Sequence, residues 1–163
     1  MLHDADTVRR QLGRPPRQPW RVEKRCSFGF PTVIATPSRL VTGELFPTTF
    51  YLTCPHLVAA ASTLESAGEA ERWASRLAAE PTLAARMLAA DAAYRAARVR
   101  ESGGADACPD VGIAGQRDPL ATKCLHAHVA AALSGIDDPV GKSVLEAIEL
   151  ECCDARCGSR EEA

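Results

Sequence analysis

One short segment, KCLHAH at residues 123–128, holds a cysteine and two histidines within six positions. We expect a helix over residues 121–133, in which Cys124 and His128 are four positions apart and share one face. A thiolate and an imidazole on one face can bind a single metal ion. His126 points about 200° away from Cys124 on such a helix, which makes it a candidate acid/base. The alternative is a buried thiol beside ordinary histidines, since free cysteine is often buried.

Two further cysteines occupy positions that suit metal ligands. Cys26 lies in a loop with glycine and proline, and Cys54 lies between a strand candidate and a helix that starts at Pro55. A helix N-terminus stabilises a thiolate. We therefore expect a metal site formed by Cys26, Cys54, Cys124 and His128, a Cys3His composition common for structural zinc. An iron–sulfur cluster is the alternative cofactor, and the tertiary fold must assemble either site, because the spacing is not that of a zinc finger.

The end of the chain carries three more cysteines, Cys152, Cys153 and Cys157. If the last helix continues, Cys153 and Cys157 share a face and form a second soft-metal site. The alternative is a loose tail with accidental thiols. We expect the tail to be dispensable for metal binding.

The elements that must position these residues define an α+β protein. A small N-terminal β-sheet is followed by a mostly helical body of about five helices. Strands are expected at 20–24, 32–35 and 48–53, where β-branched and aromatic residues gather. Helices are expected at 4–12, from Pro55 to near Gly68, at 69–79, from Pro81 to near Ser102, at 121–133, and from Pro139 to about Cys152.

The 163 residues suit one domain. We expect a basic N-terminal arm with a short helix at 1–19, a single α+β domain at 20–151, and a flexible cysteine-containing tail at 152–163. Within the domain, the glycines at 112 and 115 belong to a long loop. They allow either an anion-binding nest of backbone amides or a plain flexible loop.

Charge and hydropathy exclude several classes of protein. The net charge is −2, although residues 1–25 hold seven basic and three acidic groups. A basic arm suits nucleic acid or an acidic partner, but aromatic residues make up only 5% and none cluster beside the arginines to stack bases. Nucleic-acid binding is therefore not expected. There is no apolar run of membrane-spanning length and no signal peptide, so we expect a cytoplasmic protein whose cysteines are thiols or metal ligands.

Several segments together resemble a bacterial protein family, the domain of unknown function 501. They are RCSFGFP (25–31), ELFPTTFYLTCP (44–55), the STLES run (62–66) that leads to Gly68, GIAG (112–115), KCLHAH (123–128) and DDPVG (137–141). The resemblance covers roughly residues 8–150 and includes Cys26, Cys54, Cys124, His126 and His128. The family has no assigned activity. Its members are often encoded near a septum-formation initiator and an exopolyphosphatase-like protein, which implies, by association only, a protein partner in cell division or envelope physiology.

Three functions are compatible with these features. The first is a metalloprotein with a structural site and an interaction surface. The second is a metal-dependent or redox enzyme in which His126 is the acid/base. The third is a nucleic-acid-binding accessory protein that uses the basic arm. Few acidic residues lie near the candidate ligands in the sequence, which weakens hydrolytic chemistry that needs a carboxylate base.

Overall fold

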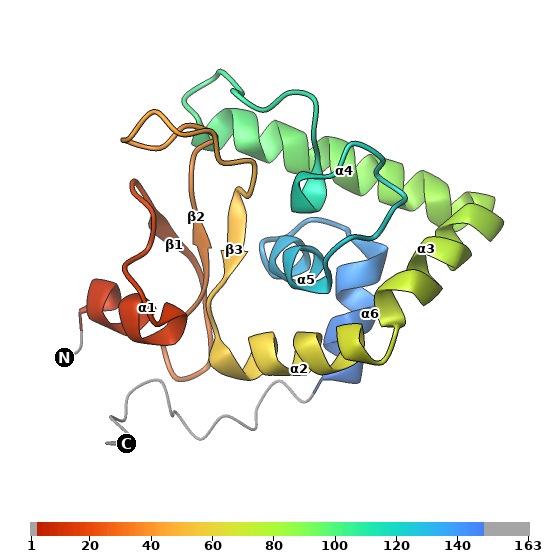
Figure 1. Ribbon diagram of the computed structural model, residues 1–163, viewed down its shortest axis with the longest axis horizontal. Coiled ribbons are helices and arrows are strands. Elements are labelled where there is room, and N and C mark those ends of the chain that lie inside the picture. Colours follow the sequence, from red (N-terminus) through yellow and green to blue (C-terminus); the bar gives the residue numbers. More distant parts are fainter. Residues whose placement is uncertain (1–2, 149–163) are drawn as a thin grey trace.

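The computed structural model describes residues 3–148 and shows an α+β fold, as the sequence predicts (Figure 1). An N-terminal helix precedes a three-stranded sheet, and a helical body follows. The described elements are α1 (Asp4–Leu12), β1 (Arg21–Arg25), β2 (Pro31–Ala35), β3 (Phe50–Leu52), α2 (Pro55–Ser66), α3 (Glu69–Ala79), α4 (Pro81–Glu101), the 3-10 turn η1 (Ile113–Gly115), α5 (Leu125–Leu133) and α6 (Pro139–Ala147). The tail cysteines lie outside the described residues.

The sheet is antiparallel, in the order β1-β2-β3. The central strand β2 is buried at all five positions, because strands pair on both of its edges and α1 packs against it. Val8 of α1 is fully buried there. The N-terminal segment expected to be an arm therefore contains a helix that packs on the sheet, while its division from the domain stays a prediction.

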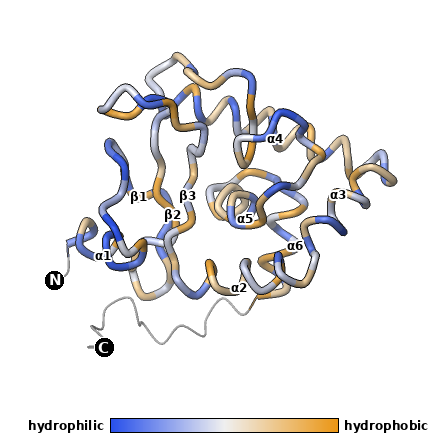
Figure 2. The backbone as a smooth tube through the Cα atoms, viewed as in Figure 1, coloured by the Kyte–Doolittle hydropathy of each residue, from blue (hydrophilic) through white to orange (hydrophobic). Residues whose placement is uncertain are grey.

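Helix α5 lies at the centre of the helical body, where it contacts β3, α2 and α6. It is largely hydrophobic along its length, whereas α1 is largely hydrophilic (Figure 2). Gly141 of α6 allows the two helices to approach closely, because a Cβ added to it would lie 2.1 Å from the backbone oxygen of His128. Within residues 3–148 no helix is both long and apolar enough to cross a membrane.

The start of α5 differs from the sequence prediction. The helix begins at Leu125, not at residue 121. Thr122 has a left-handed backbone with φ 47°, and Cys124 is extended with φ −151° and ψ 113°. A backbone N–H group here donates to a side chain and not to a helical carbonyl: Gln116 Oε1, in the preceding loop, accepts from Lys123 N at 2.9 Å. The expected helical spacing of Cys124 and His128 is therefore wrong.

The loop after α4 is anchored by a buried guanidinium. Arg98 is fully buried; it pairs with Asp106 at 2.8 Å and donates to the carbonyls of Pro47, Cys108 and Val111. The Asp106 carboxylate balances the positive charge, and the carbonyl oxygens accept hydrogen bonds from the guanidinium N–H groups. A buried arginine needs such partners because water does not reach it.

The GIAG turn folds around an anion supplied by the protein itself. The Asp91 carboxylate accepts a hydrogen bond from Ile113 N at 3.0 Å. A Cβ at Gly112 would lie 1.7 Å from the Asp91 Oδ1 atom. Glycine is needed at this position because the carboxylate fills the space of a side chain. The residues considered as an anion-binding nest thus hold an internal carboxylate.

Candidate metal centre

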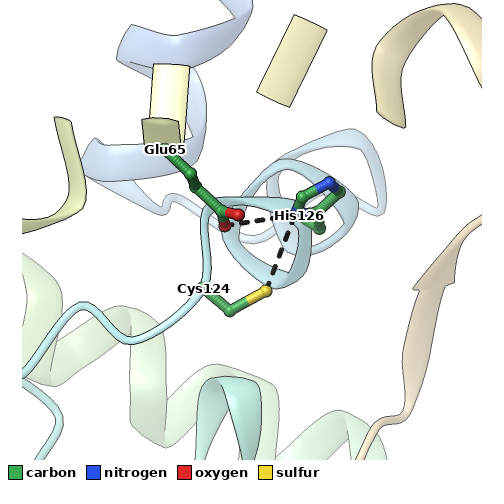
Figure 3. A group of neighbouring side chains, drawn as sticks. All are labelled: Glu65, Cys124 and His126. Carbon is green, nitrogen blue, oxygen red and sulfur yellow. Dashed lines mark hydrogen bonds and ion pairs between the residues drawn. The ribbon is translucent and has the colours of Figure 1, made fainter. Parts of the chain in front are cut away.

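Three side chains that are distant in the sequence converge where α2 ends and α5 begins. Glu65, Cys124 and His126 each offer one ligand atom, and these atoms all lie within 4.8 Å of one another (Figure 3). Among residues 3–148 this is the one group of three or more His, Cys, Asp or Glu side chains with such spacing. The group combines an oxygen, a sulfur and a nitrogen donor.

The N-terminus of α5 organises the group. Cys124 is its N-cap residue, and His126 lies in its first turn. Glu65, near the end of α2, accepts a hydrogen bond from Leu125 N at 2.7 Å. The first N–H groups of a helix have no partner within the helix, and the helix dipole favours negative charge there. This helix end therefore suits both a carboxylate and a thiolate.

The two nitrogens of His126 face different surroundings. The Nδ1 atom lies 3.1 Å from Glu65 Oε1 and 3.8 Å from Cys124 Sγ. The Nε2 atom lies 3.2 Å from the Val58 carbonyl oxygen and 3.1 Å from Ser62 Oγ. Because a carbonyl oxygen only accepts, Nε2 carries a proton. A neutral His126 then directs the lone pair of Nδ1 toward Glu65 and Cys124, which is the arrangement that a metal ligand needs.

The same neighbours favour the protonated ring when no metal is bound. The hydrogen bond to Cys124 and the negative charges of Glu65 and Cys124 raise the pKa of His126 to about 9, although partial burial opposes the rise. The side chains of His126 and Glu65 are 25% and 30% exposed, so water and small ions can reach the group.

A cleft of about 460 Å³ adjoins the centre. It lies between α1, β3 and α5, and both Cys124 and His126 form part of its wall. Phe50 and Leu52 of β3 and Ala127 of α5 also line it. The centre therefore faces a space large enough for a small molecule, since ligand pockets commonly measure roughly 300–1,000 Å³.

The structure does not bring the four sequence-predicted ligands together. Of these, only Cys124 belongs to the group, and it is joined by His126, the residue expected to act as an acid/base. Cys26 lies half-buried in the turn between β1 and β2. Cys54 is buried at the N-cap of α2.

His128 is a core residue that links two helices. It is fully buried, and its Nδ1 atom lies 2.6 Å from Asp138 Oδ2. The other Asp138 oxygen accepts from the N–H groups of Val140 and Gly141 and so caps α6. His128 is therefore part of the core packing between α5 and α6 and is not a member of the group that contains Cys124.

Glu65 is the member of the group that sequence reasoning missed. It lies sixty positions before Leu125, which it binds, so no local spacing connects it with Cys124. Its one signal was membership of the STLES run at 62–66, which contributes to the family resemblance. The sequence indicated few acidic residues near the candidate ligands, but the fold brings the carboxylate of Glu65 next to Cys124 and His126.

Comparison with known proteins places the chain in a family without an assigned function. The family model described as a protein of unknown function, DUF501, matches residues 22–146. The protein therefore belongs to this family, and the matched region contains all three residues of the centre. No curated protein and no solved structure matches the chain.

Proposed function

We propose that the protein binds a zinc ion through Glu65, Cys124 and His126. The observation that carries the proposal is the convergence of three different donor atoms on one point. Atoms bound to one tetrahedral zinc ion at about 2.0–2.3 Å lie roughly 3.3–3.6 Å apart. The distances of 3.1 Å between Nδ1 and Oε1 and 3.8 Å between Nδ1 and Sγ differ from this range by only a few tenths of an ångström.

The composition of the group favours zinc over an iron–sulfur cluster. Clusters are held mainly by cysteine thiolates, usually four. Within residues 3–148 the group supplies one thiolate. A mixture of sulfur, nitrogen and oxygen ligands is ordinary for zinc.

Three protein ligands support an open site more than a closed structural one. Structural zinc is generally bound by four side chains, whereas catalytic zinc has three and keeps one position for water or substrate. Here the adjoining cleft gives a fourth ligand access. We therefore propose a metal-dependent enzyme or ligand-binding protein, in preference to a purely structural metal site.

A second candidate function uses the same residues without metal. The pKa of about 9 keeps His126 protonated at neutral pH, so that it can act as a general acid beside the sulfur of Cys124. This is the acid/base role predicted from the sequence. A nitrogen that ligates zinc cannot also carry the transferred proton, so the metal content decides between the two functions.

Nucleic-acid binding has less support than either candidate. Arginines of the N-terminal segment are engaged within the chain: Arg17 pairs with Glu44, Arg21 with Glu101 and Arg25 with Asp4. Such pairs reduce the positive charge available for phosphates. A protein partner in cell division or envelope physiology stays a proposal that follows from the family association alone.

Zinc content tests the first proposal directly. The full-length protein, loaded with one equivalent of zinc and dialysed, is compared with Glu65→Gln, Cys124→Ser and His126→Gln by elemental analysis. Each matched control, Glu69→Gln, Cys26→Ser or His56→Gln, makes the same chemical change outside the group. We expect about one zinc per chain in the wild type and controls and strong loss in the site variants. A wild type that retains no zinc contradicts the proposal, and so does loss in Cys26→Ser equal to that in Cys124→Ser.

A further inference from the structure

The cleft beside the metal centre has a wall without countercharges. Apart from Cys124 and His126, the described side chains that line it are apolar or neutral, and none is a lysine, arginine, aspartate or glutamate. Phe50, Leu52 and Val58 supply apolar surface, and Thr48 supplies a neutral hydroxyl. A charged ligand that enters this space loses hydration and finds no opposite charge on the wall.

The metal centre adds no net charge either. A zinc ion contributes two positive charges, and the Cys124 thiolate and the Glu65 carboxylate contribute one negative charge each. With His126 neutral, the complete centre is electrically neutral. Long-range electrostatic attraction therefore does not favour an anionic ligand over an uncharged one.

From these two features we infer the class of ligand. We propose that the cleft binds an uncharged, partly apolar small molecule, which directs one oxygen or nitrogen donor to the open position of the zinc ion. This inference rests on the proposed zinc site. The volume of about 460 Å³ accommodates one small molecule, and the apolar residues Phe50, Leu52 and Val58 belong to its lining.

Matched hydroxamates test the part of the inference that concerns the cleft, because they carry the same metal-binding group and differ in the charge of the tail that lies against the wall. Cobalt(II) replaces zinc in the full-length protein, so that its absorption spectrum first reports metal binding and then ligand binding. Hexanohydroxamate has a neutral apolar tail, and succinic acid monohydroxamate has an anionic one. We expect the neutral probe to bind at least about tenfold more tightly, since the anionic tail is desolvated without a partner.

A charge placed in the cleft supplies the specificity control. Thr48 is half-buried in the cleft wall, whereas Thr82 is exposed at the start of α4. Thr48→Arg should reduce or reverse the preference for the neutral probe, because a guanidinium pairs with the anionic tail. Thr82→Arg should leave the preference unchanged.

The outcomes separate this inference from the proposed function. Normal cobalt binding with equal affinity for the two probes overturns the inference and leaves the metal site intact. A preference that Thr48→Arg and Thr82→Arg alter equally also overturns it. Absence of the cobalt–thiolate absorption in the wild type overturns the metal site, and the inference with it.

Discussion

The carboxylate of Glu65 accepts a hydrogen bond from the backbone N–H of Leu125 at 2.7 Å, across sixty positions of sequence. The same oxygen lies 3.1 Å from Nδ1 of His126. One side chain thus joins the end of α2 to the start of α5 and also completes the candidate metal centre. The two tasks need different properties of the side chain, because the first needs an acceptor oxygen and the second needs a negative charge.

Substitutions at Glu65 should separate these two tasks. Glu65→Gln keeps an acceptor oxygen but removes the charge, so we expect zinc affinity to fall roughly 100-fold. Its loss of stability in the metal-free protein should be limited to the part that the charge of Glu65 contributes by raising the pKa of His126. Glu65→Ala also removes the partner of Leu125 N and should cost about 1–2 kcal/mol in addition. Chelator competition measures the affinity, and urea unfolding measures the stability. Equal destabilisation by both variants would contradict the division of tasks.

The stability of the metal-free protein should fall in alkaline solution. The pKa of His126 is raised from 6.5 to about 9, first by the hydrogen bond to Cys124 and then by the charge of Glu65. A raised pKa contributes stability that is complete below 6.5 and is lost as the pH rises through about 9. Urea unfolding with chelator present, at pH 7 and pH 10, should show a larger decline in wild type than in His126→Gln. His56→Gln should behave as wild type, and identical declines in all three proteins would exclude the raised pKa.

Zinc affinity should have the opposite dependence on pH. The proton on His126 competes with the metal, because a ligating imidazole nitrogen must be unprotonated. The pKa of His126 is about 9, so the competing proton is lost progressively as the pH approaches that value. We therefore expect zinc affinity to increase from pH 6.5 up to about 9. Competition with a chelator of known proton affinity measures the change. In Cys26→Ser the profile should be unaltered, and a pH-independent affinity in the wild type would show that His126 is not a ligand.

His128→Ala should destabilise the protein and leave its zinc content unchanged. The substitution opens a space in the core and leaves one buried oxygen of Asp138 without its 2.6 Å partner, which together cost about 3 kcal/mol. Urea unfolding measures the loss, and elemental analysis of the folded fraction measures the metal. Loss of zinc from the folded protein would restore His128 as a ligand, as the sequence alone had suggested.

Gly141→Ala should be destabilising although it favours the helix. Alanine normally stabilises a helix relative to glycine by about 1 kcal/mol. Here its Cβ would lie 2.1 Å from the His128 backbone oxygen and 2.8 Å from Ala132 Cβ. These contacts are too short, so α5 and α6 must move apart, at a net cost of about 3 kcal/mol. Ser143→Ala on the same helix is the control. Thermal unfolding checks both, and a Gly141→Ala protein as stable as wild type would rule out the close contact of the two helices.

Most of the fold was predictable because local signals agreed with tertiary packing. Pro55, Pro81 and Pro139 each occupy the first turn of a helix, as their fixed φ and missing N–H favour. The helix expected at 69–79 has those bounds. The start of α5 was not predictable, because side-chain acceptors outside the helix bind the N–H groups there. Gln116, in the preceding loop, binds Lys123 N, and Glu65, on α2, binds Leu125 N.

The candidate centre was predictable only in part, and for the same reason. Cys124 and His126 are close in sequence, so their segment was recognisable from residue types alone. Their mutual orientation depends on where the helix begins, and an error of four residues changed which histidine faces the thiol. Glu65 reaches them through the packing of α2 against α5, which no spacing within either segment records.

The buried Arg98 determines where this chain tolerates added sequence. Its guanidinium binds carbonyls of Pro47, Cys108 and Val111, so a peptide inserted between residues 106 and 112 would pull acceptors away from a buried cation. Despite its glycines, that loop is a poor place for an epitope tag or a new terminus. The turn at Val41, which is 73% exposed, offers a surface position where a fluorophore or tag can be attached. A reporter attached to this exposed side chain lies outside the set of residues that bind Arg98 and outside the lining of the cleft.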